Sequence, residues 1–294
     1  CSNADAANNQ LFAPSSESEL QKLLAQYPDA VLWAGGTDTG LWLSKQLRRL
    51  PVIVLLGGVT SLDFIEQTDA GIRIGATTCY ADMMAVLSET WPAFAEVLRR
   101  TGSVQIRNAG TMGGNVANGS PIGDMAPMLI ALNAGLRLVG PKGSRDIQVK
   151  DFFIAYGQQD LQASEYLHSI YIPKTTGLHF AAWKISKRFD QDISAVLGAF
   201  SYRQQAGKLA DICIAFGGMA ATPKRALATE AVLRGNKITA KLLDNACAAL
   251  ADDFTPLDDM RASHKYRMQV AGAILRKAFA DEPVVYLAKA GADE

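Results

Sequence analysis

A glycine-dense stretch near the middle of the chain constrains its fold and function more than any other feature. Between Arg107 and Asp124, five of 18 residues are glycine, and no charged side chain intervenes. So little bulk does not suit an ordinary packed strand or helix, whereas glycine lets the main chain approach a ligand closely. Core-type residues such as Val116 argue against a disordered linker. The stretch is therefore predicted to wrap a large polar ligand with main-chain N–H groups, Thr111 and Asn115.

A second glycine-rich segment, residues 35–40 (GGTDTG), follows the short apolar run Val31–Ala34. Successive N–H groups in such a turn form an anion-binding nest, and threonine hydroxyls add donors. Taken alone, the segment is equally consistent with a plain strand-to-helix turn. Its distance from the dense stretch, about 75 residues, fits one diphosphate held between two loops.

Several common catalytic motifs are missing. No glycine has another glycine two positions on, so a G-x-G-x-x-G dinucleotide fingerprint is excluded, and no phosphate loop ending in Gly-Lys-Ser/Thr occurs. The histidines show no H-E-x-x-H spacing, and no G-x-S-x-G nucleophile elbow is present. Metal-dependent hydrolysis and acyl transfer therefore lose most of their support.

Charge and cysteine content limit the partners. The 294 residues include 29 Lys+Arg and 29 Asp+Glu, so no basic excess favours nucleic acid. Apolar runs such as Val52–Leu56 are far shorter than the roughly 18 residues of a membrane helix. The four cysteines form no C-x-x-C pair, which argues against a disulfide scaffold, a zinc ribbon or an iron–sulfur ligand set. We expect a cytoplasmic protein without a bound metal.

Hydrophobic periodicity predicts two domains. The first half alternates helices over 17–26 and 81–88 with strands over 31–34, 51–56 and 72–74. Ser15 or Ser16 is the expected cap of the first helix, and Thr77 or Thr78 that of the second. The opening Cys1–Ala4 resembles the cleavage scar of a purification tag, although an N-terminal cysteine is also consistent with a lipid-modified start. Residues 1–10 are therefore excluded from the fold.

The segment Pro173–Gly177 combines turn-forming residues and predicts a linker. Beyond it, three strands over 180–186, 193–202 and 209–216 precede helices over 224–233, 240–251 and 261–279. Strands followed by helices indicate a separate α+β domain. The predicted boundaries are 11–175 for the first domain and 176–286 for the second, with a tail over 287–294.

Three segments resemble the flavin domains of the molybdenum hydroxylases, which include xanthine dehydrogenases and carbon monoxide dehydrogenase. Gly113-Gly114-Asn115 followed by Asp124 is similar to a specific signature of that family. The stretches 184–196 (KISKRFDQDISAV) and 216–226 (FGGMAATPKRA) are similar to the bacterial xanthine dehydrogenase flavin domain in particular. The resemblance covers nearly the whole chain after residue 10.

The resemblance implies an α+β fold: a two-subdomain FAD-binding cradle of the vanillyl-alcohol-oxidase-like (PCMH) type, followed by a small C-terminal α+β domain with a three-stranded sheet and helices. It implies non-covalent FAD, with a diphosphate between the two loops. The cofactor-binding residues it implies are Leu32, Ala34, Gly35, Gly36, Thr37, Asp38, Thr101, Ala109, Gly110, Thr111, Gly113, Gly114, Asn115, Asp124, Leu167 and Lys184.

Lys184 is also the residue that the resemblance places in catalysis. A cation beside the N1–C2 edge of the flavin ring would stabilise the anionic reduced ring and raise its potential. Without the resemblance, a solvated lysine at a strand end is the simpler interpretation.

The expected activity is that of a xanthine dehydrogenase-type oxidoreductase, which takes electrons from iron–sulfur clusters and reduces NAD. The clusters and the molybdenum cofactor are expected on an iron–sulfur module and a molybdopterin-containing large subunit, because this chain lacks their ligands. It is then either an excised fragment or a separate subunit. The alternatives are a flavin subunit like that of carbon monoxide dehydrogenase or aldehyde oxidase, a stand-alone flavin oxidase, and a scaffold without cofactor.

Overall fold

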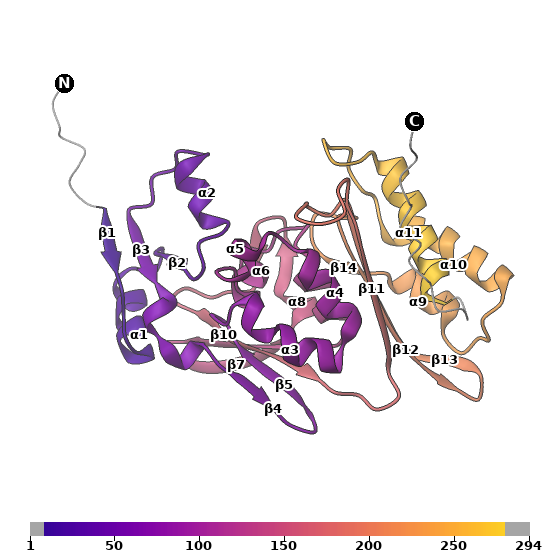
Figure 1. The fold of residues 1–294 in the computed structure, drawn as a ribbon, viewed down its shortest axis with the longest axis horizontal. Helices are drawn as coiled ribbons and strands as arrows, with labels where there is room; N and C mark the ends of the chain where they lie inside the picture. The colour runs from indigo at the N-terminus through magenta and orange to yellow at the C-terminus, as the bar shows by residue number, and fades with distance from the viewer. Residues whose placement is uncertain (1–8, 280–294) are drawn as a thin grey trace.

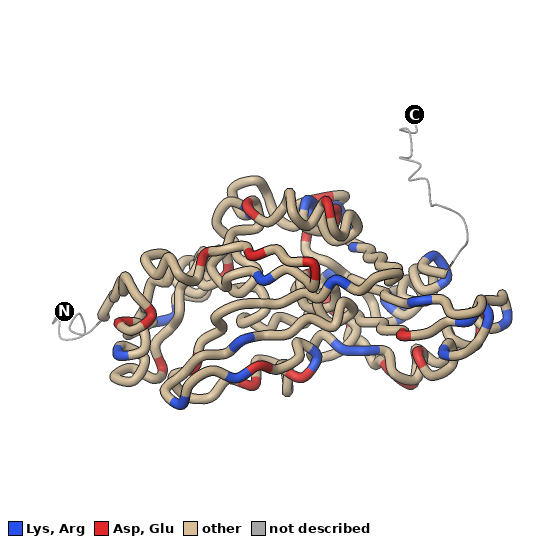
Figure 2. The backbone as a smooth tube through the Cα atoms, turned by 90° about the horizontal axis from the view of Figure 1, so that it is seen from below, with Lys and Arg blue, Asp and Glu red and all other residues tan. Residues whose placement is uncertain are grey.

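A computed structural model describes residues 9–279, which form three main β-sheets arranged in a row (Figure 1). The expectations for Cys1–Ala4 and for the tail 287–294 lie outside these residues. Figure 2 shows basic and acidic positions interspersed along the chain, in keeping with equal totals of the two charges. The longest described helix has 15 residues, and none of the described helices is long and apolar enough to cross a membrane.

The first sheet is parallel and places β3 (Val52–Leu55) between β1 (Gln10–Phe12) and β2 (Val31–Trp33). Helix α1 (Glu17–Gln26) has the predicted bounds, and Ser16 is its cap because the serine hydroxyl accepts from Glu19 N at 3.3 Å. Its apolar face is buried in a cluster that includes β3. Strand β2 of this sheet leads into the first glycine loop.

The second sheet is antiparallel and has the strand order β4-β5-β10-β6-β7. Strand β10 comes latest in the sequence but lies at its centre, where it pairs with both β5 and β6. Helices α3, α4 and α7 contribute most of the helical residues to the core that this sheet shares. The bounds are β4 Ile65–Gln67, β5 Gly71–Gly75, β6 Gly135–Gly140, β7 Gly143–Gln148, β10 Tyr166–Pro173, α3 Tyr80–Thr90, α4 Pro92–Arg100 and α7 Met125–Ala131.

The predicted cap of the helix after β5 is wrong. Helix α3 begins one residue after Cys79, which supplies no side-chain cap. The Thr78 hydroxyl instead lies 3.1 Å from both the main-chain N and the O of Phe64. Thr78 is buried and anchors a turn, because its hydroxyl satisfies main-chain groups 14 residues away.

The third sheet has four strands, β11-β12-β13-β14, where three were predicted. The fourth, Lys224–Arg225, pairs with β13 and therefore does not begin a helix as expected. Helices α4 and α7 contact one face of this sheet, and α9 and α11 contact the other (Figure 1). The bounds are β11 His179–Ile185, β12 Val196–Gln205, β13 Lys208–Gly217, α9 Leu227–Leu233, α10 Ala240–Asp253 and α11 His264–Ala278.

Short elements complete the fold. Helices α2, α5 and α6 belong to the two glycine loops and are described with the site. Away from it lie η1 (Leu56–Gly58), η2 (Thr60–Leu62), α8 (Val149–Phe152), β8 (Phe153–Ala155) and β9 (Gln158–Gln159).

Candidate functional site

The first glycine loop follows β2 directly and leads into α2 (Thr39–Ser44). Gly36 has a φ of +67°, a left-handed conformation that glycine adopts without strain. Within residues 9–279, the main-chain N–H groups of Gly36, Thr37 and Asp38 donate no hydrogen bond. They are therefore free to donate to a ligand, as the sequence predicts for an anion nest.

The dense stretch is more ordered than the sequence predicts. It contains α5 (Val104–Arg107, which overlaps its start) and α6 (Met112–Asn118), so the prediction that it forms no helix is wrong. The cause is local: Thr111 caps α6, with its hydroxyl accepting from Gly114 N at 2.9 Å. Gly119 then ends the helix in the left-handed region, with a φ of +65°.

The two loops are in direct main-chain contact. A Cβ at Gly35 would overlap the carbonyl oxygen of Ala109, and a Cβ at Gly110 would lie 3.3 Å from the Thr37 hydroxyl oxygen. Glycine is therefore required at Gly35 by the approach of the other loop. Two segments about 75 positions apart thus form one cradle lined by main-chain groups.

A buried ionic cluster lies at the end of the dense stretch. Lys184 Nζ donates to Asp124 Oδ2 at 2.6 Å and to the Ser194 hydroxyl at 2.8 Å, and that hydroxyl donates to Asp124 Oδ1 at 2.5 Å. The Thr101 hydroxyl lies 3.0 Å from Asp124 Oδ2. The Lys184 side chain is 1% exposed and that of Asp124 5%. The interpretation of Lys184 as a solvated strand-end lysine is therefore wrong.

Comparison with known proteins identifies the family. The model of the FAD binding domain in molybdopterin dehydrogenase matches residues 7–175, and that of the CO dehydrogenase flavoprotein C-terminal domain matches residues 181–281. The chain belongs to the FAD-binding family of molybdenum hydroxylases.

Individual relatives in this family differ in their names and lengths. The xanthine dehydrogenase/oxidase of Gallus gallus is 32% identical over 255 residues, which cover 82% of this chain and 19% of that protein. This chain thus spans about a fifth of the length of the xanthine dehydrogenases that it matches. The xanthine dehydrogenase FAD-binding subunit of Escherichia coli O157:H7 is 28% identical over 88% of this chain and 90% of its own length.

Solved structures in the family share the fold. The carbon monoxide dehydrogenase of Hydrogenophaga pseudoflava superposes with a TM-score of 0.87 and 28% identity, covering 92% of this chain and 95% of that one. Quinoline 2-oxidoreductase of Pseudomonas putida 86 gives a TM-score of 0.83 and 26% identity, with 92% and 95% covered. These matches confirm the predicted α+β architecture of a PCMH-type FAD-binding cradle followed by a smaller C-terminal domain.

The cradle of this FAD-binding domain fits the cofactor. The N–H groups of residues 36–38 donate no hydrogen bond within residues 9–279, and the Gly35–Ala109 contact brings the main chains of the two loops together, with the Trp33 indole against Gly36. A diphosphate needs such close main-chain donors. Of the other predicted residues, Leu32 lies in β2 and Ala34 directly follows that strand, both half-buried, and Leu167 is 5% exposed in the main core.

Asn115 and Tyr80 link the flavoprotein's cradle to the buried cluster. Asn115 Oδ1 accepts from Met125 N at 3.3 Å, so part of its polar capacity supports the start of α7. Burial raises the pKa of the Tyr80 hydroxyl, and the nearby negative charge of Asp124 raises that pKa further. Tyr80 therefore stays neutral at physiological pH.

Sequence reasoning missed Ser194 and Tyr80. Ser194 belongs to the stretch 184–196 that resembles the family, but nothing in its type or spacing marks it as a partner of Asp124, 70 residues away. A signal for it would have required knowledge of long-range contacts.

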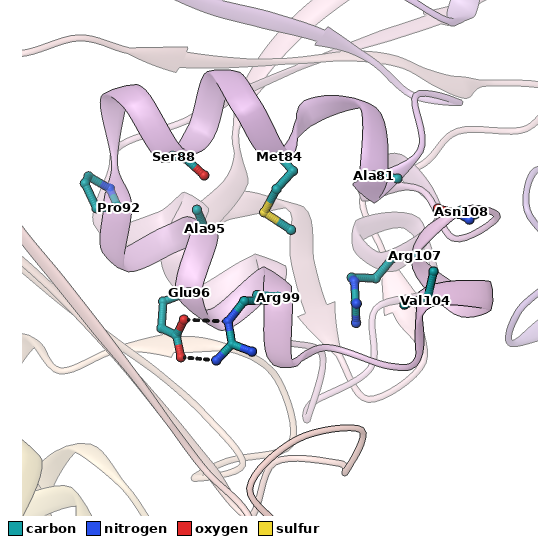
Figure 3. A pocket seen from close by; sticks show the side chains of 10 residues that line it. All are labelled: Ala81, Met84, Ser88, Pro92, Ala95, Glu96, Arg99, Val104, Arg107 and Asn108. Atoms are coloured by element: carbon teal, nitrogen blue, oxygen red, sulfur yellow. Dashed lines mark hydrogen bonds and ion pairs between the residues drawn. The ribbon is translucent and has the colours of Figure 1, made fainter. Parts of the chain in front are cut away.

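A depression of about 550 Å³ adjoins the dense stretch on the side of α3, α4 and α5 (Figure 3). Its lining combines apolar side chains, such as Met84 and Val104, with polar ones, and Arg99 is held there by hydrogen bonds of 2.9 Å to Glu96. Lys184, Asp124 and Ser194 do not line it. The depression is therefore a separate feature from the ionic cluster.

Proposed function

We propose that this chain is the FAD-carrying electron-transfer part of a xanthine dehydrogenase-type molybdenum hydroxylase. Electrons would come from iron–sulfur clusters on a partner module, and NAD would be the acceptor, in the cytoplasm. The observation that carries the proposal is the contact of the two glycine loops at Gly35 and Ala109, which would form a cradle for a diphosphate. FAD, when bound, supplies both single-electron and hydride chemistry.

In this proposal the two loops bind FAD, and the buried ionic cluster sets the reduction potential of the flavin. The N–H groups of residues 36–38 and the Thr37 hydroxyl would hold the diphosphate from one side, opposite Gly110, Thr111, Gly113, Gly114 and Asn115. Leu32, Ala34 and Leu167 would supply apolar contacts, and Thr101 and Asp124 polar ones.

Lys184 would act as a member of a pair rather than as a free cation. Its ammonium group already donates to Asp124 and Ser194, so the carboxylate is neutralised at the site. The pair would then present one remaining ammonium N–H and little net negative charge to the flavin ring. Low net negative charge favours an anionic reduced ring, because like charges repel more strongly where water is excluded.

A second candidate is a flavin subunit that passes electrons to a quinone or to oxygen. It is supported by the likeness to carbon monoxide dehydrogenase and quinoline 2-oxidoreductase. The likeness to the Escherichia coli xanthine dehydrogenase FAD-binding subunit supports the first. The molybdopterin-containing large subunit and iron–sulfur module would be partners in either case, and the molybdenum substrate would react there.

Three measurements on the purified chain test the proposal. Its absorption spectrum should show flavin bands, and heat or acid should release FAD rather than FMN. Anaerobic NADH should bleach the flavin, whereas xanthine should have no effect. A colourless protein that rejects added FAD would contradict the whole proposal. A flavin that ignores NADH would favour the second candidate, and rapid bleaching by a small organic substrate would favour a stand-alone oxidase.

A further inference from the structure

A buried arginine on a helix that packs against the third sheet contacts two segments that adjoin the ionic cluster. Arg267 belongs to α11 and is 2% exposed. One guanidinium nitrogen donates to the carbonyls of Ala195 and Gly218, the latter at 2.8 Å, and the other donates to Asp259 Oδ1 at 2.7 Å. Burying a guanidinium costs desolvation free energy, which ordinary helix packing does not require. A specific role in joining these segments explains its presence.

The two carbonyl acceptors belong to segments that are each linked to Asp124 or to the turn just before it. Ala195 directly follows Ser194, whose hydroxyl donates to Asp124. Gly218 donates its N–H to the carbonyl of Pro121 at 2.8 Å, three residues before Asp124. One guanidinium therefore joins the segment that carries Ser194 to the turn that supports the end of the dense stretch.

The two segments approach each other closely at Gly218. Gly218 has a φ of +79°, and a Cβ there would overlap the carbonyl of Ala195. The two carbonyl groups thus face the same guanidinium at close quarters. Two carbonyl dipoles aimed at one point repel each other unless a cation lies between them. Arg267 supplies that cation.

We propose that Arg267 is a positioning residue for the flavin site: by holding the carbonyls of Ala195 and Gly218, it fixes the contact between Ser194 and Asp124. The inference rests on the proposed function, since it assumes that the Asp124–Lys184 pair lies next to the flavin. Without Arg267, Ser194 loses its fixed position and Asp124 loses one donor. The carboxylate then carries more uncompensated negative charge, so the flavin becomes harder to reduce.

A double-mutant cycle on the FAD-loaded protein tests this chain of contacts. The flavin midpoint potential is measured by dithionite titration with a reference dye for wild type, Arg267→Met, Ser194→Ala and the double variant. Both single variants should shift the potential to more negative values, and the double variant should shift it no further than Ser194→Ala, because residues that act through one contact are not additive. The FAD dissociation constant of Arg267→Met should stay close to the wild-type value, because Arg267 donates to Ala195, Gly218 and Asp259 and to neither glycine loop.

Two further variants separate positioning from mere stability. Arg276→Met removes an arginine of the same helix that pairs with Asp244 at 2.6 Å on the surface, and should leave the potential unchanged. Arg267→Lys keeps the charge and should recover part of the potential. An unchanged flavin potential in Arg267→Met, or full additivity of its shift with that of Ser194→Ala, would overturn this inference. FAD binding by the wild-type protein would in that case still support the proposed function. If the Arg267→Met protein does not fold, the Arg267→Lys cycle with Ser194→Ala decides the same question.

Discussion

The glycine cradle and the buried ionic cluster are two differently built halves of one site. The cradle consists of main-chain groups on two loops, and its residues range from buried to exposed. The cluster consists of side chains from four separate segments at positions 101, 124, 184 and 194, and its Asp124–Lys184 pair is almost fully buried. Main-chain donors bind a ligand with little dependence on side-chain chemistry, whereas a buried ion pair sets the local charge. We infer that the cradle determines FAD affinity and the cluster determines flavin potential.

The sharpest way to break this comparison is Gly35→Val. The new side chain would overlap the Ala109 carbonyl and force the two loops apart. We expect the FAD dissociation constant to rise by a factor of 100 or more, equivalent to about 3 kcal/mol. Flavin absorbance during ultrafiltration measures the loss. Gly57→Val is the matched control, since a Cβ at this glycine meets nothing within 4 Å. Equal FAD occupancy in the two variants would remove the cradle assignment.

Lys184→Met should lower the stability of the fold and also shift the flavin potential. It leaves the Asp124 carboxylate buried without its cation, which costs about 3–5 kcal/mol in the free energy of unfolding. Urea denaturation measures that loss. In the protein that remains folded, the flavin potential should move to more negative values, and reduction by NADH should slow. The double variant Lys184→Met/Asp124→Leu should recover much of the stability, because an apolar pair avoids the unpaired charge.

A normal potential in the folded Lys184→Met protein would contradict the role given to the pair. It would leave Lys184 with a structural role only, and would make the cradle alone responsible for the behaviour of the flavin.

The sequence predicts local structure well where the physics is local. Helix α1 has its predicted bounds and cap because a serine followed by regularly spaced leucines is a short-range signal. The glycine loops were located for the same reason. Thr78 was misassigned because its hydroxyl bonds to Phe64, 14 residues away, and the pairing of Lys224–Arg225 with β13 likewise depends on a distant strand.

The cradle and the cluster also differ in how far the sequence predicts them. The glycine-rich sequence predicts the cradle, although the contact of Gly35 with Ala109 is visible only in the folded protein. Ser194 and Arg267 carry no such signal, because their partners Asp124 and Ala195 are 70 and 72 positions away. Periodicity and composition describe single segments, so they do not reveal which segments meet.

The ion pair of Arg145 and Glu165 lies away from both regions, and removing it should have a smaller, pH-dependent effect on the stability of the fold. Hydrogen bonds from Arg145, at 2.8 Å and 2.9 Å, hold the pKa of Glu165 below its ordinary value. A depressed carboxyl pKa stabilises the fold above the unfolded-state pKa, and this contribution disappears as the pH falls through the folded-state value. Glu165→Gln should therefore cost about 1 kcal/mol at pH 7.

The wild type and the Glu165→Gln variant should converge in stability below about pH 4. Thermal unfolding across pH 3–8 measures this convergence. FAD affinity at pH 7 should be the same in both proteins, since the pair does not contact either loop. A loss of FAD affinity would show that the cradle depends on distant packing, and would weaken the division between binding and tuning regions.

The smallest predicted effect separates two adjacent glycines of the dense stretch. A Cβ at Gly113 would overlap the main chain of Ala76, so this glycine is required by packing within the protein, and Gly113→Ala should destabilise the fold itself. Gly114 is exposed, and a Cβ there would meet only the Thr111 hydroxyl oxygen, at 2.9 Å. Because α6 prefers alanine to glycine but the new Cβ crowds the capping hydroxyl of Thr111, Gly114→Ala should change the unfolding temperature little. Its FAD affinity should nevertheless fall several-fold, since the methyl group would stand where the main chain approaches the ligand. Thermal unfolding of the FAD-free protein and FAD titration, done on both variants, separate the two roles. Undiminished FAD affinity in Gly114→Ala would place the cofactor away from this face of α6 and leave the 35–38 loop as its principal support.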